Sequence, residues 1–430
     1  MRLETIHPRE LSASDAALWR AHQSADQALQ SPYLTPDWAQ MIGSVRDDAR
    51  VCVIQDGAGF FGVQRLSRFA AMGLGAPIAD YQGVVGLADL PVNRADLCRS
   101  LQVGRIDVTH APAGQNLLQG AVAGQEGSWI ADVAGGRDLY EAALKQRRSE
   151  FVRQTDKKTR KLEREHGQLE FRAQSTERAD FETLVAWKNA QLKRTGQPEI
   201  WAAPWVAQTL DASFETRSTQ FGGALFTLSL KGKLAAGAFC LRSPRVLHFW
   251  IVAHDNAYDS YSPGVQLARW VLGWAGDNGI AEIDFGPGDY QYKRQLSTGQ
   301  RMLERGVVAG ASWSAAVRRA ENAVRARIES VEAPTYVTIP MEITVNKPAK
   351  DVWARIGKYC DIAEWFQIAA GCTMTSGKEG EVGSVRSVGS VILVGKTELS
   401  YTYTQPVRDG RPYNLYHGTL EARPLTAKTT

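Results

Sequence analysis

The order of predicted elements between residues 222 and 286 restricts the possible folds more than any other feature of the sequence. Three apolar runs follow one another there, separated by the turns KGK and SPR, and strands joined by such turns are typical of β-hairpins. The third run, 246–253, leads through a polar loop into a helix with Leu267 and Val271 on its apolar face, and then into a strand at 280–286. This order predicts mixed sheets with helices on both faces, so we expect an α+β fold.

A second hairpin pattern occurs in the first part of the chain. An apolar strand, a turn at Gly57 and a second strand with its own glycine occupy residues 49–69, and Gly232 has the same place in the later hairpin. A long charged helix is expected between the two patterns, at 139–165, and Gly167 is expected to end it. The repeat indicates an internal duplication, although two unrelated hairpins would give a similar pattern.

The strongest shift in composition lies near residues 312–345. An alanine- and arginine-rich run at 312–332 predicts a helix, and Pro334 and Pro340 then bracket a short strand-like piece, Tyr336–Ile339. We therefore expect a domain boundary here. The resulting division has a first half at 1–138, a second half at 139–311, a helical linker at 312–336 and a C-terminal segment at 337–430.

Composition and charge exclude several classes of protein. The chain of 430 residues has 50 Lys and Arg against 46 Asp and Glu, and a net charge of +4 is too small to argue for a nucleic-acid partner. The five cysteines form no CxxC pair, so we expect neither a metal site nor a disulfide framework. We recognise no signal peptide and no transmembrane run, and a reducing cytoplasm is the expected compartment.

The start of the helix after the third strand is a candidate anion site. Ser262, Pro263 and Gly264 lie at this point. Backbone N–H groups at a helix N-terminus favour phosphate, proline suits the first turn, and glycine allows a ligand to approach the backbone. An ordinary capped helix accounts for the same residues, so this feature alone assigns no ligand.

Three motifs give residues 150–310 a family resemblance. They are RKLERE at 160–165, YDSYSPGVQL at 258–267 and IDFGPGDYQYKRQL at 283–296. In this combination they resemble the GNAT-like acyltransferase domain of the cellulose-biosynthesis (CelD-type) acetyltransferase family. The first 140 residues look like the N-terminal half of that family through ADYQGVVG at 79–86. The similar FemAB peptidyltransferases also use two tandem GNAT-like halves, which fits the repeated hairpin.

The resemblance implies an acetyl-CoA or other acyl-CoA donor and an amine acceptor, without a metal. A thioester along the third strand would have its carbonyl polarised by backbone N–H groups near 251–254, and the pyrophosphate would lie on the start of the next helix. The glycine-rich pyrophosphate loop of ordinary GNAT enzymes is reduced here to SPG. The donor-binding residues expected on this basis are Ile251, Val252, Ala253, Ser262, Pro263, Gly264, Val265 and Gln266.

An attacking amine must be neutral, so the reaction needs a general base. The candidates are His254, Asp255 and Asp284, which ends the last strand of the unit. A turn or helix cap is the alternative role for Asp284. His248 lies within an apolar strand, and we expect it to be a packed residue rather than a base.

The second motif of the resemblance supplies further candidates. Tyr290, Tyr292 and Lys293 are suited to protonate the leaving thiolate or to hold the acceptor. A solvated cation is the alternative for Lys293. The expected catalytic set is therefore Asp284, His254, Tyr292 and Lys293.

The predicted helix at 139–165 is rich in both Lys and Arg, with acidic residues interspersed. A solvated face with i,i+4 ion pairs is the simplest interpretation. A platform for an anionic partner such as CoA phosphates, tRNA or a membrane surface is the alternative. FemAB-like use of aminoacyl-tRNA keeps tRNA open, although Phe151 is the one aromatic residue between 150 and 165 and stacking is poorly supported.

Residues 337–430 resemble another family, the SRPBCC or START-like helix-grip domains. The resemblance rests on NKPAKDVWARIGKYCDIAEWF at 346–366 and CTMTSGKEGEVGSVRSV at 372–388. It implies a curved antiparallel sheet around an apolar cavity for a hydrophobic ligand, of which this segment has only a part. We expect a partial helix-grip sheet here.

These features lead to three functional hypotheses. The first is an acyl-CoA-dependent N-acyltransferase acting on a sugar, peptide or lipid precursor in polysaccharide, cellulose or cell-envelope synthesis. The second is a FemAB-like aminoacyl-tRNA-dependent peptidyltransferase. The third is a non-catalytic protein that binds a lipid or another hydrophobic ligand through its C-terminal segment. The sequence indicates no oligomeric state.

Overall fold

The computed structural model describes the chain except residues 1, 311, 330–340, 366, 369–370 and 406–415. The chain forms two compact units, Met1–Ala333 and Pro334–Thr430. The strand-like piece expected at Tyr336–Ile339 lies outside the described residues. None of the helices in the described part of the chain is both long and apolar enough to cross a membrane.

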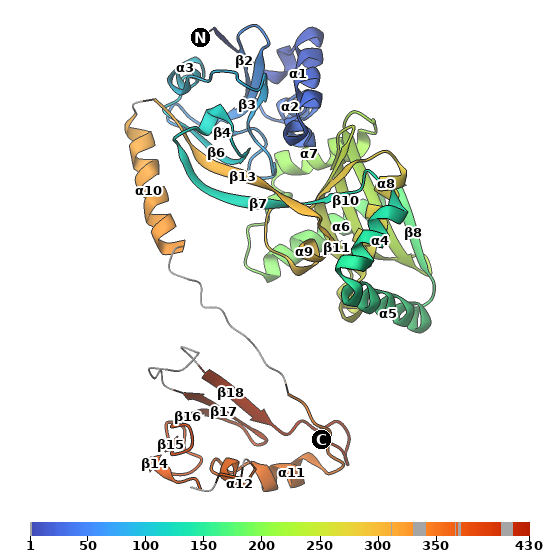
Figure 1. The fold of residues 1–430 in the computed structure, drawn as a ribbon, viewed down its shortest axis with the longest axis vertical. Helices are drawn as coiled ribbons and strands as arrows, with labels where there is room; N and C mark the ends of the chain where they lie inside the picture. The colour runs from blue at the N-terminus through green and yellow to red at the C-terminus, as the bar shows by residue number, and fades with distance from the viewer. Residues whose placement is uncertain (1, 311, 330–340, 366, 369–370, 406–415) are drawn as a thin grey trace. The chain divides into compact units, whose positions relative to one another are not determined.

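A mixed sheet of 13 strands organises the larger unit (Figure 1). Its order is β1-β2-β3-β4-β6-β13-β7-β12-β11-β10-β9-β8, and β5 pairs with β3. Two of its strand pairs, β4 with β6 and β11 with β12, are parallel. The strands are β1 Leu3–Ile6, β2 Ala49–Ile54, β3 Gly59–Arg65, β4 Ala71–Gly73, β5 Val84–Gly86, β6 Ile106–Pro112, β7 Val122–Asp132, β8 Leu169–Ser175, β9 Gly222–Leu230, β10 Lys233–Arg242, β11 Val246–His254, β12 Glu282–Asp284 and β13 Gly299–Val308. The α+β class expected from the sequence is confirmed.

Both hairpins read from the sequence form as antiparallel pairs, β2 with β3 and β9 with β10. Successive side chains of β10 enter two different cores, as the period of a strand requires. Phe239 packs on the face covered by α6, whereas Ala238 and Cys240 pack on the face covered by α8. Because helices cover both faces, the strands of this half are apolar almost throughout.

Helices connect and cover the strands of the larger unit. They are α1 Ala13–Ala25, α2 Pro36–Val45, α3 Arg94–Ser100, α4 Arg137–Arg147, α5 Ser149–His166, α6 Arg178–Arg194, α7 Pro204–Glu215, α8 Pro263–Asp277, α9 Gln291–Leu296 and α10 Trp313–Glu329. Short 3₁₀ turns are η1 Pro8–Glu10, η2 Gln27–Leu29, η3 Pro32–Leu34, η4 Asn116–Leu118, η5 Ile200–Ala202 and η6 Asn256–Tyr261.

The single charged helix expected at 139–165 is wrong in one respect, because the structure has two helices there. Arg148, with φ −140° and ψ 46°, leaves the helical region and separates α4 from α5. The break allows α4 to bury Tyr140 and α5 to bury Leu162 against different neighbours. Gly167, at φ +111°, ends α5 as expected.

Two long strands tie the halves of the sheet together. β7 and β13 run from the first half into the second, as Figure 1 shows. β13 returns from the second half of the sequence and pairs with β6 of the first half. The two halves also share one apolar core, in which the Trp38 and Trp250 rings lie 5.8 Å apart, edge to face.

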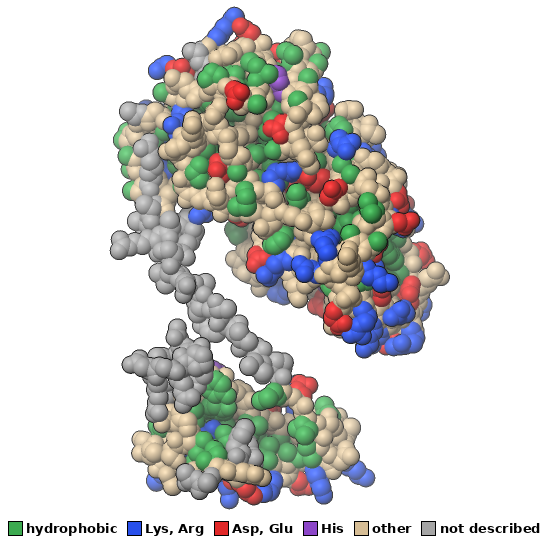
Figure 2. Space-filling view, viewed as in Figure 1, with side chains coloured by type: hydrophobic (Ala, Val, Ile, Leu, Met, Phe, Trp, Pro, Cys, Tyr) green, Lys and Arg blue, Asp and Glu red, His purple; other side chains and the backbone are tan. Residues whose placement is uncertain are grey.

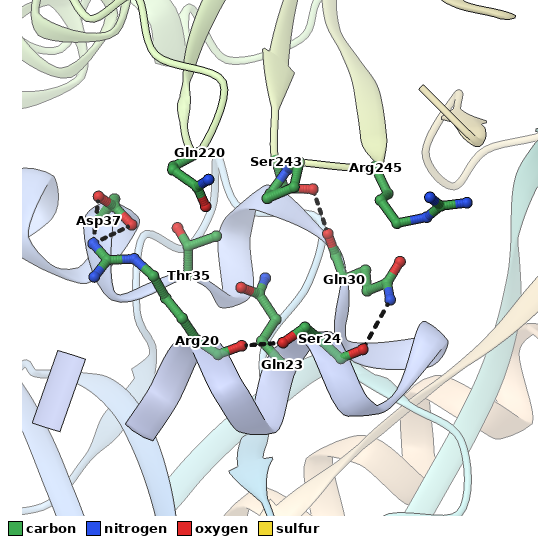
Figure 3. A pocket seen from close by; sticks show the side chains of 10 residues that line it. Arg20, Gln23, Ser24, Gln30, Thr35, Asp37, Gln220, Ser243 and Arg245 are labelled. Carbon is green, nitrogen blue, oxygen red and sulfur yellow. Dashed lines mark hydrogen bonds and ion pairs between the residues drawn. The ribbon is translucent and has the colours of Figure 1, made fainter. Parts of the chain in front are cut away.

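The far ends of the shared interface are polar. Figure 3 shows a cavity of about 160 Å³ between α1 and the turn after β10, where Ser243 Oγ donates to the carbonyl of Gln30 at 2.6 Å. On the opposite side of this cavity Arg20 makes a bidentate pair with Asp37, at 2.9 and 3.0 Å. At this end of the interface the bond from Ser243 to Gln30 joins the two halves, whereas Arg20 and Asp37 both belong to the first half.

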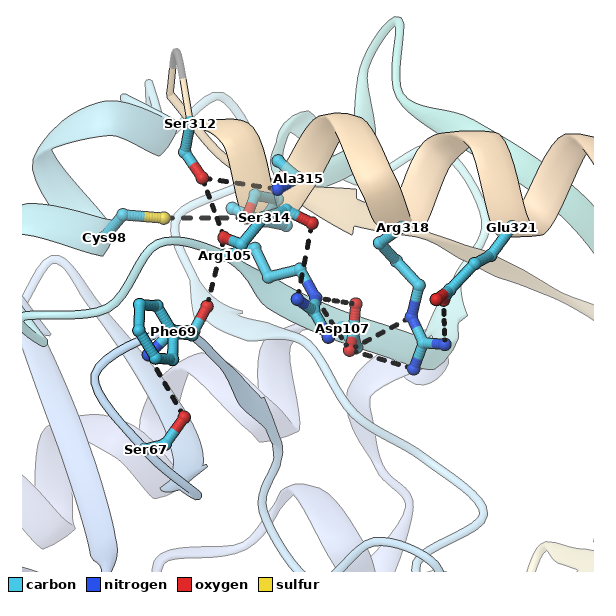
Figure 4. Close-up of polar contacts among 11 residues, drawn as sticks. Ser67, Phe69, Cys98, Arg105, Asp107, Ser312, Ser314, Ala315, Arg318 and Glu321 are labelled. Carbon is cyan, nitrogen blue, oxygen red and sulfur yellow. Dashed lines mark hydrogen bonds and ion pairs between the residues drawn. The ribbon is translucent and has the colours of Figure 1, made fainter.

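Helix α10 packs on the first half of the sheet. Asp107 of β6 receives the guanidinium groups of Arg105 and Arg318, each within 3.3 Å (Figure 4). Arg105 also donates to the carbonyl of Ser314, in the first turn of α10. The start of the predicted linker helix is therefore part of the larger unit.

The smaller unit has an antiparallel sheet of five strands and two short helices. Its elements are α11 Ala349–Ile356, α12 Ile362–Trp365, β14 Met374–Ser376, β15 Val385–Arg386, β16 Ile392–Lys396, β17 Ser400–Gln405 and β18 Tyr416–Glu421. Its buried apolar cluster is small and is built around Tyr359, Val391, Leu393 and Tyr401. The buried Arg386 guanidinium stacks on the Tyr359 ring at 4.4 Å and extends this core.

The expectation that no cysteines pair is wrong for the smaller unit. Cys360 and Cys372 form a disulfide with their Cα atoms 5.4 Å apart. Their separation of 12 residues is not a CxxC spacing, so the sequence rule that looks for close pairs misses it. Cys52, Cys98 and Cys240 are free and buried.

Candidate functional site

The site begins where two parallel strands separate. β11 pairs with β12 from Val246 to His248, and β12 ends opposite, at Asp284. β11 continues to His254, bonded to β10 on its other side. Among the described strands, none pairs with this extension on the β12 side, so its edge is open to a ligand.

A cavity of about 530 Å³ lies along this open edge. Four parts of the chain form its walls: helix α6, the end of β11 with the start of α8, the segment from Phe285 to α9, and Asp80 from the first half. Its lining includes Asp80, Lys188, Arg194, Trp250, Val252, Ala253, His254, Asp259, Ser262, Gly264, Val265, Phe285, Tyr292 and Lys293. The lining combines apolar side chains with many polar and charged groups, and such a hollow can fix the orientation of a small molecule.

Aromatic residues make the inner wall apolar. The Phe249 and Phe285 rings lie 5.0 Å apart, and Tyr292 stands edge-on to Phe285 at 6.1 Å. Burial raises the pKa of Tyr292 above its ordinary value, so its hydroxyl stays protonated at neutral pH. The wall therefore suits an uncharged acyl chain and thioester.

The outer end of the cavity meets the N-terminus of α8. Ser262 precedes this helix in the left-handed conformation, at φ 55° and ψ 54°. A Cβ added at Gly264 would meet only the His254 Nδ1 atom, at 3.6 Å, so there is room here for a ligand. Lys158 of α5 donates to Ser262 Oγ at 2.9 Å and brings a cation to the same point. Together these groups fit a phosphate, although Val265 N–H is already bonded to the Ser262 carbonyl at 3.1 Å.

Two carboxylates border the same end. Asp259 accepts from His254 Nε2 at 2.7 Å. Asp255 accepts from the Ala257 backbone N–H at 3.0 Å, and this bond holds its pKa below the ordinary value. Lys233 lies 3.3 Å from Asp255 and neutralises part of its charge.

Lys293 lies at the inner end of the cavity and is 6% exposed. Its ammonium donates to the carbonyls of Gly286 and Pro287, at 3.2 and 2.6 Å. Burial lowers the pKa of Lys293, while nearby carboxylates oppose the shift. A cation held this way is placed to stabilise negative charge that develops beside it.

Asp284 takes a position beneath the cavity rather than in its wall. It is completely buried and accepts from Ser128 Oγ at 2.7 Å and from the Gly286 N–H at 2.8 Å. Burial pushes its pKa upward, but the charge of His248 outweighs this and holds the pKa below its ordinary value. The bond to Gly286 is the turn-forming contact that was the alternative expectation for this residue.

Most of the expected donor-binding residues gather at the cavity. Val252, Ala253, Ser262, Gly264 and Val265 line it, whereas Ile251, Pro263 and Gln266 do not. Ile251 is fully buried, and the Gln266 side chain donates to the Tyr261 carbonyl at 2.8 Å. Of the expected catalytic set, His254, Tyr292 and Lys293 line the cavity and Asp284 does not.

Sequence reasoning missed two kinds of residue. Asp80 lies within the ADYQGVVG motif but had no role assigned, and it reaches the cavity from the first half of the chain. Lys188 and Arg194 come from α6, which carries no motif. His248 is fully buried, as expected of a packed residue, yet it contacts two carboxylates, which the sequence pattern did not suggest.

The residues that line much of the cavity are similar in sequence to a known protein domain. Residues 145–294 match the sequence model of the acetyltransferase (GNAT) domain. No curated protein matches the chain. The match spans α5 to α9, which contribute most of the cavity wall.

Three solved structures illustrate the structural similarity. The C-terminal domain (DUF2156) of a putative lysylphosphatidylglycerol synthetase from Agrobacterium fabrum is 13% identical, with a TM-score of 0.45 over 72% of this chain and 96% of that chain. FemX is 13% identical, with a TM-score of 0.47 over 71% and 96%. A tandem GNAT protein from the clavulanic acid biosynthesis pathway is 11% identical, with a TM-score of 0.40 over 72% and 99%. The chain thus contains a GNAT-type acetyltransferase domain, by the match at residues 145–294.

Proposed function

We propose that the protein is an acyl-CoA-dependent N-acyltransferase that transfers an acetyl or longer acyl group, not an aminoacyl group, to an amine. The observation that carries this proposal is the open edge of β11 above a cavity that ends at the start of α8. An extended thioester fits along such an edge because unpaired strand N–H groups bind its carbonyl. Ser262, Gly264 and Lys158 would hold a donor phosphate at the other end.

The chain's own residues supply the remaining chemistry. Lys293 would stabilise the charge on the thioester oxygen or the departing sulfur, and Tyr292 is placed to orient the acyl group. The amine needs a proton acceptor, for which His254 and Asp80 line the cavity. Acyl transfer of this kind needs no metal ion, because the groups above supply the polarisation and the proton transfer.

The acceptor we infer is a cationic amine on a sugar, peptide or lipid precursor. Carboxylates at both ends of the cavity, Asp80 inside and Asp259 at the rim, support a substrate that arrives as an ammonium. The resemblance to the CelD-type family suggests a precursor of cellulose, another polysaccharide or the cell envelope. A cytoplasmic location fits this proposal, since acyl-CoA is made there.

Calorimetric titration with acetyl-CoA and a longer acyl-CoA tests the proposal. We expect one site per chain, and weaker binding in Gly264→Glu because the new carboxylate would repel the donor phosphate. Glu substitution at exposed Lys157, which makes no hydrogen bond or ion pair with the described residues, is the matched control for added negative charge. Absence of heat with every acyl-CoA would contradict the acyltransferase and favour the non-catalytic alternative, in which the C-terminal unit binds a hydrophobic ligand.

An aminoacyl-tRNA donor is the second candidate, and one observation favours it. Lys and Arg side chains gather over α5 (Figure 2). Within the described part of the chain, Lys157 and Arg160 have no carboxylate partner, so their charge is available to a polyanion. If tRNA is the donor, its binding will weaken steeply with salt because phosphate contacts release counterions. Binding that is weak and insensitive to salt would exclude it.

A further inference from the structure

Three ionisable side chains meet under the floor of the cavity. His248 of β11 lies between two carboxylates, with Nε2 2.9 Å from Asp80 Oδ2 and Nδ1 3.6 Å from Asp284 Oδ1. His248 and Asp284 are completely buried, whereas the Asp80 side chain is 31% exposed and lines the cavity. The cluster therefore connects a sealed interior to the place where a substrate would lie.

The surroundings fix each member of the cluster. Ser128 Oγ and the Gly286 N–H both donate to Asp284 Oδ1. Gly286 adopts φ +73°, and a Cβ at this position would lie 2.7 Å from Asp80 Oδ2, so only glycine fits there. The Tyr33 ring packs edge-on against the His248 ring at 4.9 Å.

Charge balance favours a protonated imidazole. Buried carboxylates need a charged partner, and His248 has a carboxylate beside each ring nitrogen. Nε2 is hydrogen-bonded to Asp80, whereas Nδ1 lies 3.6 Å from Asp284, at ion-pair distance but without a hydrogen bond. Burial opposes the charge on His248, but Asp284 and Asp80 outweigh it and raise the pKa of His248 to about 9. The other titratable groups near this ring or its carboxylates include Tyr33, Tyr81, Lys293 and Glu126, and the ion pair of Glu282 with Arg301. Burial keeps both tyrosines neutral by raising their pKa values. Two carboxylates, one imidazolium and the Lys293 ammonium sum to zero charge.

Asp80 differs from Asp284 in one important respect. Its Oδ2 atom is occupied by His248, and within the described residues no hydrogen bond to its Oδ1 atom is recorded. The hydrogen bond to Oδ2 thus orients the carboxylate, and Oδ1 can still accept a hydrogen bond or a proton. An oriented carboxylate at a cavity wall is suited to bind an ammonium and to take a proton from it.

We propose that Asp80 accepts the proton of the acceptor amine and that His248, held by Asp284, is the positioning residue that orients Asp80. This inference deepens the proposed acyl transfer and rests on it. It also explains why the two halves of the chain pack as one unit, because the proton acceptor comes from the first half and the donor site from the second.

The acceptor nitrogen gives up two protons when an ammonium becomes an amide. The ammonium gives one proton to Asp80, and the nitrogen lone pair attacks the thioester carbonyl carbon. The C–N bond forms and the C–S bond breaks, with its electron pair leaving on sulfur. The nitrogen loses its second proton, which ends on the thiolate, so the products are an amide, the free CoA thiol and one proton released from Asp80 to solvent. Lys293 would stabilise the negative charge during transfer.

The first experiment tests the cluster without any substrate. NMR of the full chain labelled at its histidine rings reports the protonation of each imidazole, and His248→Gln identifies the His248 signal. We expect His248 to remain an imidazolium at pH 7.5 and to lose its proton at lower pH in Asp284→Asn than in the wild type. A neutral His248 at pH 7.5 would overturn the proposal while leaving the proposed acyl transfer intact.

The second experiment measures release of CoA thiol from acetyl-CoA with glucosamine, lysine and ethanolamine as acceptor probes. We expect Asp80→Asn to lower kcat by about 100-fold or more, the usual contribution of a general base. We expect His248→Gln to lower kcat about 10-fold, because an Asp80 carboxylate that has lost this hydrogen-bond partner is no longer held in one orientation. In both variants the Kd of acetyl-CoA should stay within about threefold of the wild type.

His110→Gln is the matched control, since His110 also pairs with a carboxylate, Glu126 at 3.0 Å, but lies outside the cavity. It should leave kcat unchanged. Full activity in either His248→Gln or Asp80→Asn would overturn the inference. A third outcome is that the wild type binds acetyl-CoA and NMR shows the imidazolium, but no acyl group is transferred to any probe. That outcome would contradict proton transfer to Asp80 and would still support the positioning of Asp80 by His248.

Discussion

Lys158 is the residue through which the charged helix α5 reaches the cavity. Its ammonium is bonded to Ser262 Oγ, next to Gly264, where a donor phosphate has room. The neighbouring residue Lys157 is also exposed, but it makes no such contact with the described residues. A single helix therefore offers a functional cation and a control cation side by side.

We expect Lys158→Ala to weaken acetyl-CoA binding about five- to tenfold, since it removes one charge-assisted contact worth about 1–1.5 kcal/mol. Lys157→Ala should change the Kd less than about twofold. Calorimetry on the two variants measures the difference. Equal effects would mean that α5 acts only through its overall charge.

The charge of His248 also predicts how stability depends on pH. Because its pKa is about 9 in the folded protein and 6.5 is its ordinary value, the stabilisation is complete below pH 6.5 and is lost as pH rises through about 9. The charge on His248 should raise the free energy of unfolding of the wild type by about 3 kcal/mol at pH 6, and this contribution should be lost by pH 10. His248→Gln lacks the contribution at every pH, so the difference between the two proteins should shrink by that amount as pH rises. Urea unfolding at several pH values measures it. A difference that does not change with pH would contradict a charged His248.

At the scale of elements, sequence patterns predicted the strands, turns and helices that are determined by residues close to one another in the chain. The three strands of the second half, the turn at Gly232 and helix α8 follow local apolar periodicity, and all form as expected. Arg148 carries no helix-breaking signal, so the separation of α4 from α5 was not predictable from propensity. Its cause lies in packing against distant elements, such as the bond from Tyr140 to the Leu296 carbonyl.

The site was predictable only in part for the same reason. Glycine and the SPG turn marked the start of α8, and the last motif marked Tyr292 and Lys293. The bond between Asp80 and His248 joins residues 168 positions apart, and no spacing rule detects it. Asp284 was found as a polar residue at a strand end, but whether such a residue faces a cavity or the interior depends on the neighbouring strands.

The disulfide in the smaller unit is expected to stabilise the strands of that unit. Cys360 and Cys372 close a loop between α11–α12 and β14. In the chain-entropy description, a loop of this length stabilises the folded state by about 2–3 kcal/mol. We expect dithiothreitol to lower the protection of β16 and β17 against hydrogen exchange, and to leave the larger unit unchanged.

The Cys360→Ser, Cys372→Ser double variant is the control for that measurement. It should show the lower protection at the start and no response to the reductant. A response in the larger unit would be unexpected, because its three free cysteines are buried and unpaired.

At the scale of the whole molecule, the larger unit behaves as one folding body. β13 lies between β6 and β7, and Trp38 and Trp250 belong to one core, so neither half can complete its sheet or bury its apolar face alone. The smaller unit has its own sheet and its own core. The repeated hairpins therefore divide the sequence of the larger unit into two similar orders of elements. The two halves are nevertheless expected to be stable only together.

We expect residues 1–333 to fold without the remainder and to bind acetyl-CoA with a Kd within about twofold of the full chain. Residues 139–311 alone should fail to fold cooperatively, because they expose the Trp250 face and lose the β6 partner of β13. Circular dichroism melts and calorimetry on both fragments measure this. Tight acetyl-CoA binding by residues 139–311 alone would contradict it.

The central claim is that a donor lies along the open edge of β11 and ends at the start of α8. Hydrogen exchange measured with and without acetyl-CoA tests this most directly, because it locates the ligand without knowledge of the acceptor. We predict increased protection at residues 249–266 and 285–293, and no change around the separate cavity of Arg20 and Arg245. Protection confined to other parts of the chain, or none at saturating acetyl-CoA, would contradict the account.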